Sequence, residues 1–205
     1  MIKIEYTNVY GLEAAIRGMR NPMNSWDKDD SKYWDTHLAY IGDNNLKLMK
    51  SLVKAGTDHG KFMRMIGVSL DIVAPLYWWK EFDTYKVGTV ANSCSTMHKI
   101  HDKEFTIDDF SLEHVDGCDE ERLIEMLLFV LNTNRKIFLT TKNKKYWWQL
   151  IQLLPSSYNQ RRTVTLNYAV LRNIYHARKN HKLDEWRAFC EWIETLPYSE
   201  LIIES

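Results

Sequence analysis

Residues 66–82 contain the pattern that most restricts the fold of this chain. Hydrophobic residues occupy every second position from Ile66 to Ile72, with small or polar residues between them. This period of two predicts a half-buried strand. Pro75 follows and suits the first turn of a helix, because its missing N–H would have no partner there. The aromatic run Leu76–Trp79 then predicts a short helix directly after the strand.

Hydrophobic spacing elsewhere predicts several helices and one further strand. The expected strands cover residues 2–9 and 62–73, and a polar, charge-mixed loop covers residues 23–36. The expected helices cover residues 11–20 and 44–55, a stretch from Asp119, residues 146–153, residues 162–180, and a last segment from Trp186 to Ile193. Helices packed on a small antiparallel or mixed sheet define an α+β class, and 205 residues suit a single domain over 1–205.

Charge balance and cysteine usage exclude several classes of protein. Lys and Arg together number 27, as do Asp and Glu, so no net charge points to a nucleic-acid or membrane partner. No apolar run approaches the ~20 residues that span a bilayer, and the N-terminus lacks a signal-peptide core. The 3 cysteines are widely spaced, which predicts a reduced, cytoplasmic protein. His98 and His101 have metal-like spacing, but such a pair in a polar loop usually faces solvent, so no metal site is predicted.

Hydroxyl and amide side chains crowd the extended segment after the aromatic helix. They are Thr84, Thr89, Asn92, Ser93, Ser95 and Thr96. Such groups offer hydrogen-bond donors to a bound anion, whereas Ser, Thr and Asn in turns also cap their own backbone. The segment is therefore a candidate binding loop, with backbone capping as the alternative.

A second candidate segment is basic and covers residues 160–182. Its cations are Arg161, Arg162, Arg172, Arg178, Lys179 and Lys182. Arginine binds oxyanions bidentately, so the segment is a candidate phosphate site, with a solvated helix face as the alternative. At helical spacing Asn167 and Arg178 lie on one face, with their positions roughly 16 Å apart along the axis. Arg178 on the apolar side of a helix requires a partner, and a phosphate or a carboxylate would be one.

These two segments resemble the signature regions of the flavin-dependent thymidylate synthases, a family of flavoproteins that methylate dUMP. With Ala74-Pro75 on the family's turn into a helix, Thr84-Tyr85-Lys86 falls on its Arg-His-Arg triplet. The triplet holds the reactive ring of FAD, so the resemblance assigns Thr84, Tyr85 and Lys86 to cofactor binding. Lys86 keeps one positive charge, and Tyr85 could stack on the flavin ring.

The residues after the triplet follow the family motif with one inserted residue. Asn92 falls on the family's asparagine, which implies a cofactor contact, and Ser95 falls on a serine that touches the substrate pyrimidine and phosphate. Ser93 replaces an acidic residue at the substrate. Met97 replaces an arginine, so His98 is the neighbouring group that could reach the same anion. The shape of the motif is retained while most of its charge is lost.

The basic segment resembles the family's later block, in which one end of a helix meets flavin and the other meets the nucleotide phosphate. Arg161 and Arg178 fall on arginines of this block and are expected to bind substrate, with Arg162 as the alternative to Arg161. Asn167 falls on the helix-opening asparagine and is expected to contact the cofactor, although simple N-capping is the alternative. The turn 56–59 stands where the family has a flavin-binding Gly-His-x-Ser/Thr turn, and it makes His59 a cofactor candidate with its histidine displaced by two residues.

The resemblance implies a flavin-dependent thymidylate synthase-like fold and the reductive methylation of dUMP, or of a related pyrimidine nucleotide. FAD would be the cofactor, NADPH and methylenetetrahydrofolate the co-substrates, and the protein a homotetramer with sites at subunit interfaces. Ser95 and Arg178 would be the catalytic residues. Because the paired arginines of the triplet are missing, a nucleotide-binding, regulatory or interaction protein without catalysis is the alternative.

Overall fold

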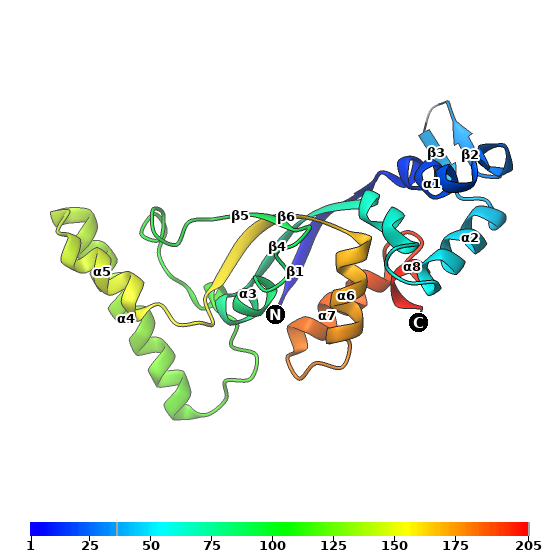
Figure 1. Cartoon of the computed structure of the whole chain (residues 1–205). Coiled ribbons are helices and arrows are strands. Elements are labelled where there is room, and N and C mark those ends of the chain that lie inside the picture. Colours follow the sequence, from blue (N-terminus) through cyan, green and yellow to red (C-terminus); the bar gives the residue numbers. More distant parts are fainter. Residues whose placement is uncertain (36, 205) are drawn as a thin grey trace. The chain divides into compact units, whose positions relative to one another are not determined.

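The structure is a computed structural model that describes residues 1–35 and 37–204. Its main sheet has four strands in the order β1-β4-β6-β5 (Figure 1). These strands are Lys3–Tyr10 (β1), Gly67–Pro75 (β4), Asn159–Asn167 (β6) and Val90–Ser93 (β5). Buried residues alternate along β4 from Val68 to Ala74, as the period of two predicts. None of the helices in the described residues combines the length and apolar character needed to cross a membrane.

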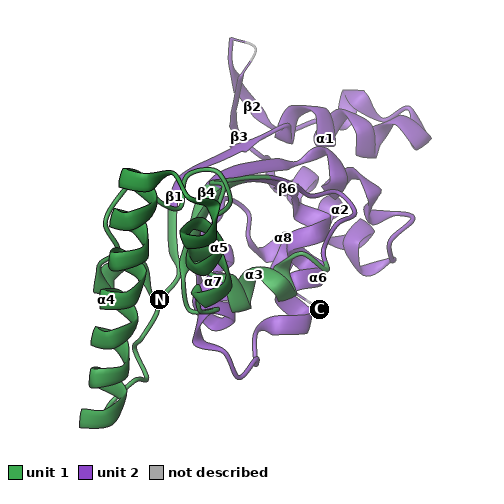
Figure 2. Cartoon of the chain, turned by 90° about the vertical axis from the view of Figure 1, so that its left-hand side faces the viewer, with its two compact units in different colours: residues 1–4, 71–84, 92–163 green, residues 5–70, 85–91, 164–205 purple. Residues whose placement is uncertain are grey.

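The described chain divides into two compact units, drawn in different colours in Figure 2. Unit 1 consists of residues 1–4, 71–84 and 92–163, and unit 2 of residues 5–70, 85–91 and 164–204. The expectation of a single domain over 1–205 stays a prediction.

Unit 1 contains two aromatic or aliphatic clusters. Its helices are α3 (Leu76–Phe82), the 3₁₀ turn η4 (Ile107–Asp109), α4 (Cys118–Thr141) and α5 (Lys144–Leu153), of which α4 and α5 pack on each other. Trp78, Trp79 and Phe82 of α3 are buried and lie 4.9–5.3 Å apart between ring centroids. A second cluster joins the loop before α4 to the two long helices through buried Phe105, Leu131 and Leu150.

Unit 2 gathers helices around α6 (Tyr168–Arg178). The others are α1 (Leu12–Arg20), α2 (Asp43–Lys54), α7 (Asp184–Glu194) and α8 (Glu200–Ile203), with 3₁₀ turns η1 (Asn21–Met23), η2 (Trp26–Lys28) and η3 (Gly60–Met65). Two short strands, β2 (Lys32–Trp34) and β3 (His37–Tyr40), pair antiparallel. Helix α6 contacts η3, α7 and α8, and its buried Leu171 and Ile174 contribute to the core of the unit.

The α+β class predicted from the sequence is confirmed, but three expected elements are wrong in part. Residues 162–167 form strand β6 and not the start of a helix, because Val164 and Leu166 are buried at a period of two and Thr163 and Thr165 favour extended backbone. The expected strand over 62–73 begins only at Gly67, since consecutive burial of Phe62 and Met63 belongs to the 3₁₀ turn η3. The expected loop over 23–36 contains η2 and β2.

Candidate functional site

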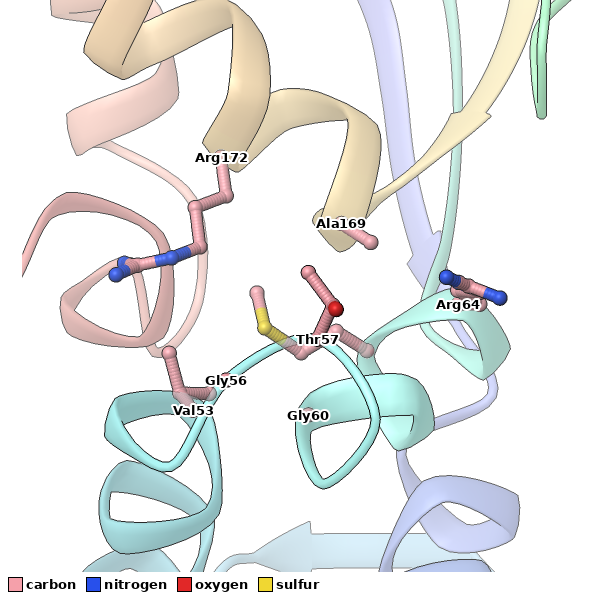
Figure 3. A pocket seen from close by; sticks show the side chains of 8 residues that line it. Val53, Gly56, Thr57, Gly60, Arg64, Ala169 and Arg172 are labelled. Atoms are coloured by element: carbon pink, nitrogen blue, oxygen red, sulfur yellow. The ribbon is translucent and has the colours of Figure 1, made fainter.

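A cavity of 250 Å³ lies in unit 2 between the start of α6 and the turn that follows α2 (Figure 3). Its lining residues come from α2, the turn 56–59, η3 and α6; they are Val53, Gly56, Thr57, Gly60, Met63, Arg64, Ala169 and Arg172. The turn that the sequence assigns to flavin binding therefore lies beside the early end of α6, which carries the same assignment. Figure 3 shows Arg64 and Arg172 on either side of Thr57.

Backbone geometry holds the turn in place. Gly56 has φ +105°, a conformation that costs glycine little. Its carbonyl accepts the N–H groups of His59 at 3.2 Å and Gly60 at 2.8 Å. Thr57 is consequently fixed at the cavity, whereas His59, which lies at the start of η3, lines a different cavity. The structure thus separates the predicted cofactor residue His59 from the cavity that Thr57 lines.

The two arginines of this cavity differ in their hydrogen-bond partners and in their exposure. Arg172 donates to the carbonyl oxygens of Ile202 at 2.9 Å and of Glu204, so it ties the segment after α8 to α6. Burial lowers the pKa of Arg172 from its ordinary value. Arg64 is exposed, and within residues 1–35 and 37–204 its guanidinium has no hydrogen-bond or ion-pair partner. Arg64 is therefore the cation of this cavity that can pair with an incoming anion.

Asn167 caps α6. Its Oδ1 accepts the backbone N–H of Val170 at 3.1 Å, so the capping alternative left open by the sequence is realised. The same side chain borders the loop between α3 and β5, since a Cβ added to Gly88 would lie 3.1 Å from Asn167 Nδ2. Gly88 has φ +77° and allows this close approach without a side chain. The start of α6 and the early part of the candidate binding loop, around Gly88, thus lie together.

Arg178, at the other end of α6, contacts Tyr85. The guanidinium Nε donates to the Tyr85 hydroxyl at 2.9 Å, and the guanidinium carbon lies 4.8 Å from the ring centroid of Trp186. Two residues predicted to bind cofactor and substrate, far apart in sequence, are therefore in direct contact. The sequence predicts only that Trp186 belongs to the last helix, and nothing in its spacing indicates a contact with Arg178.

A second cavity, of 300 Å³, lies in unit 1 and brings together two predicted substrate residues, Ser95 and Arg161. Lys99 and Lys103 also line it. Ser95 Oγ accepts the backbone N–H groups of Met97 at 3.2 Å and His98 at 2.9 Å, which is the capping role held open above.

The two arginines near the start of β6 have carboxylate partners. Arg161 lies 3.0 Å from Asp71 through both Nε and Nη2. A hydrogen bond from the Thr163 hydroxyl, followed by Arg161, holds the pKa of Asp71 below its ordinary value. Arg162 lies 4.2 Å over the Trp79 ring and donates to Asp83 at 2.7 Å. The two neighbouring arginines therefore have separate partners.

The remaining predicted site residues lie at the surface. Thr84 donates its hydroxyl to the Glu81 carbonyl at 2.7 Å, at the end of α3. Thr84 is exposed, and so are five further predicted site residues, His59, Lys86, Asn92, Ser93 and His98. Sequence reasoning missed Arg64 and Ala169 as cavity residues and gave Arg172 only as one cation of the basic segment. Only the packing of η3 on α6 brings Arg64 to that helix. In the described part of the chain, no group of three or more His, Cys, Asp or Glu residues could hold a metal ion.

Comparison with known proteins gives a match at the level of structure. No protein-family model matches the sequence, and no curated protein matches it either. Thymidylate Synthase X (ThyX) from Helicobacter pylori, solved with FAD and dUMP, matches with a TM-score of 0.73 at 15% identity, over 100% of this chain and 98% of that one. A second structure of this flavin-dependent enzyme with FAD and dUMP gives a TM-score of 0.72.

The UMP/dUMP methylase PolB from Streptomyces cacaoi, bound with 5-Br dUMP, matches with a TM-score of 0.63 at 14% identity, over 98% of this chain and 94% of that one. At such low identity these matches establish the fold. The resemblance seen in the sequence is thereby confirmed for the whole chain, which has the fold of the flavin-dependent thymidylate synthases.

Proposed function

We propose that this chain is a flavin-dependent thymidylate synthase-like enzyme that binds FAD and reductively methylates dUMP or a related pyrimidine nucleotide. The observation that carries the proposal is the match over the whole chain to two structures solved with FAD and dUMP. The methylase PolB, which also has this fold, adds a further nucleotide-methylating relative. The expected form is a cytoplasmic homotetramer that uses NADPH and methylenetetrahydrofolate as co-substrates.

The cavity beside α6 suits an anionic dinucleotide such as FAD. It combines the Thr57 hydroxyl with the unpartnered cation of Arg64, and pyrophosphate oxygens prefer such donors. Thr57 and Arg64 would hold the cofactor there, and the Asn167 amide would orient the part of it that reaches the start of α6. When bound, FAD would take reducing equivalents from NADPH and supply them to the methylene group delivered by the folate.

Arg178 in unit 2 is a proposed nucleotide ligand and, as a separate proposal, so are Ser95 and Arg161 in unit 1. Arg178 is half-buried and already ordered by Tyr85, so its charge can be directed at an oxyanion at little entropic cost. Ser95 Oγ accepts two backbone N–H groups, and its own proton remains a donor for a ligand oxygen. Arg161 must exchange or share its Asp71 partner when it binds a phosphate.

The loss of charge in the candidate binding loop favours a second function. Thr84 carries no charge and its hydroxyl is engaged by Glu81, so it cannot offset negative charge that develops during reduction. Only Lys86 keeps a cation of the triplet. The second candidate is accordingly a protein that binds a nucleotide without catalysis, as a regulator or an interaction partner.

The purified protein tests whether the chain binds FAD or only shares the fold of proteins that do. A flavin absorbance spectrum that co-purifies, or that returns when FAD is added, supports the proposal; a colourless protein that FAD cannot restore contradicts it. Arg64→Gln is expected to weaken FAD binding about tenfold, because a hydrogen bond to a charged group contributes about 1.5–3 kcal/mol. Lys61→Gln is the matched control. It removes an exposed cation that lines the same cavity as His59 and not the cavity of Arg64.

Catalysis is tested in cells that lack thymidylate synthase. Growth without added thymidine supports the enzyme, whereas a yellow, dUMP-binding protein that does not restore growth supports the binding function.

A further inference from the structure

The 3₁₀ turn η3 contributes to two cavities of unit 2. One is the cavity of Thr57 and Arg64, in which we place the cofactor. The other, which we call the methionine cavity, has a volume of 1040 Å³ and is formed by α1, η1, η2, α2, the turn 56–59 and η3. It is the cavity that His59 lines. Small organic ligands occupy cavities of roughly 300–1,000 Å³, so this one is large enough for such a molecule.

Apolar side chains form much of the wall of the methionine cavity. Three of the 8 methionines of the chain line it, namely Met19, Met23 and Met65. Met19 and Phe62 are buried, whereas Met23 is 81% exposed, so the cavity extends from the core of the unit to solvent. Methionine adapts to irregular shapes, and its sulfur attracts aromatic rings. This wall therefore favours a ligand with an aromatic body.

Positive side chains outnumber negative ones in the described lining of this cavity. Arg20, Lys28 and Lys61 line it, against the carboxylate of Asp58. Within residues 1–35 and 37–204, the ammonium groups of Lys28 and Lys61 have no hydrogen-bond or ion-pair partner. Both side chains are exposed, and a lysine ammonium on its flexible stem can turn toward an anion that enters.

Arg20 adds a fixed charge to the wall. It is 4% exposed, and its Nε donates to Asn45 Oδ1 at 2.8 Å. Its Nη1 and Nη2 donate to the carbonyl oxygens of Ser25 at 3.1 Å and Lys28 at 2.6 Å. These acceptors are neutral, so they hold the guanidinium without cancelling its charge. The charge acts on the carboxylate of Asp30, which accepts two backbone N–H groups at the start of α2 and does not line the cavity.

We propose that the methionine cavity is a second binding site, which takes a small aromatic anion such as an aromatic carboxylate. The aromatic body lies against the methionines and Phe62, and the anionic group pairs with Lys28 and Lys61. The inference goes beyond the proposed function and does not depend on it, because the two cavities share no lining residue.

A hollow that holds only solvent is the competing explanation, and two probes that differ in one group separate the two. The anionic probe is 8-anilinonaphthalene-1-sulfonate, and the neutral probe is N-phenyl-1-naphthylamine. They share one ring system, and only the first carries a sulfonate. The fluorescence of both rises when the rings leave water, so titration gives an affinity for each and shows what the charge contributes.

The double variant Lys28→Gln/Lys61→Gln removes both ammonium groups and keeps the apolar wall. We expect it to bind the anionic probe about tenfold or more weakly, as for lost hydrogen bonds to a charged group, and the neutral probe within about twofold of wild type. Lys54→Gln is the matched control, because Lys54 is an exposed cation on α2 that does not line the cavity. It should leave both affinities within about twofold.

Leu52→Trp tests the apolar wall, because it puts a large ring into the cavity and should weaken both probes about tenfold. Thermal unfolding checks that this variant is folded, and the lysine variant decides the matter if it is not. Added FAD should leave the anionic probe bound.

Equal affinity of wild type and the lysine double variant for the anionic probe would overturn the inference. So would displacement of that probe by FAD, or no binding of it at all. A wild-type protein that binds the probe but not FAD contradicts the proposed function alone and leaves this test unchanged.

Discussion

Arg178 is the single residue from which the most specific prediction follows. Its Nε donates a hydrogen bond to the Tyr85 hydroxyl. We expect Arg178→Ala to abolish dUMP binding. The loss of a charged, multiple hydrogen-bond donor corresponds to a fall in affinity of about ten- to hundredfold or more. The protein should stay folded, because the side chain is half-buried and lies at a helix end. Calorimetric titration with dUMP measures the effect, and circular dichroism the fold.

Arg187→Ala is the control for this change. Arg187 lies on α7 in the same unit, and its exposed guanidinium contacts Asp184 and the His181 carbonyl. Removing it takes away one positive charge without changing the contact between Arg178 and Tyr85. An equal loss of dUMP affinity in both variants would mean that net charge, rather than Arg178, attracts the nucleotide.

The cysteines provide a pH-dependent prediction at the same scale. Burial raises the pKa of Cys190 to about 11, so at pH 8 only about one molecule in a thousand carries the reactive thiolate. Cys94 and Cys118 are exposed. We expect two thiols to react rapidly with a disulfide reagent at pH 8 in the native protein and three after unfolding. Rapid reaction of a third thiol in the folded protein would contradict the burial of Cys190.

For single residues, the sequence indicated contacts with nearby backbone as alternatives, and it did not indicate partners that lie far along the chain. The sequence left capping open for Ser95 and Asn167, and both side chains do cap backbone N–H groups. It gave no sign that Arg161 pairs with Asp71, because β4 and β6 become neighbours only when the sheet forms. Arg64 was missed for the same reason.

At the scale of elements, variants of Asn167 can separate its role as the N-cap of α6 from its proposed contact with the cofactor. Asn167→Ala removes the cap and is expected to cost about 1 kcal/mol in the free energy of unfolding. Asn167→Ser keeps an oxygen that can accept the Val170 N–H, so stability should be largely restored. If the amide also contacts the cofactor, Asn167→Ser should weaken FAD binding although the helix remains capped. Chemical denaturation and FAD titration of the two variants measure these effects.

An unchanged FAD affinity in Asn167→Ser would assign the residue to capping alone. Comparison of the two variants is needed because Asn167→Ala changes helix stability and the candidate contact together.

The helix and strand bounds were predicted where amphipathic spacing is regular. Helices α1, α2 and α7 begin and end within a few residues of expectation, since each buries one apolar face. Strand β6 was wrongly included in a helix, because its arginines and threonines were interpreted as a basic helical face. The buried residues Val164 and Leu166 are spaced by two, as in a strand. Two apolar positions are too few to distinguish a strand from a helix by spacing alone.

At the scale of the whole molecule, the class of fold was predictable and the assembly of the sites was not. A strand, a sharp turn at Pro75 and an aromatic helix restrict the fold strongly, and this chain has them in that order. Core packing tolerates substitution of side chains that retain size and apolar character, so a fold persists at 15% identity. A binding site depends on individual donors and charges, which can differ between proteins that share a fold.

The proposed homotetramer gives the last prediction. Helix α4 exposes an apolar face: Leu123 is 67% exposed, Met126 60% and Phe129 67%, and their spacing of three residues places them on one side. Such a patch on a folded protein usually meets a partner, and we expect a second copy of this chain to cover it. Phe129→Glu puts a charge in that interface and should shift the protein to a smaller species, measured by light scattering after size-exclusion chromatography.

Leu139→Glu is the matched control, because Leu139 is also exposed on α4 but lies about 140° around the helix from the centre of this patch. It adds the same charge to the same helix and should leave the oligomer unchanged. If both variants dissociate the protein, added charge destabilises the assembly in general and the patch is not specifically involved. If Phe129→Glu keeps the wild-type mass, the oligomer forms through another surface, and the apolar face of α4 needs a different partner.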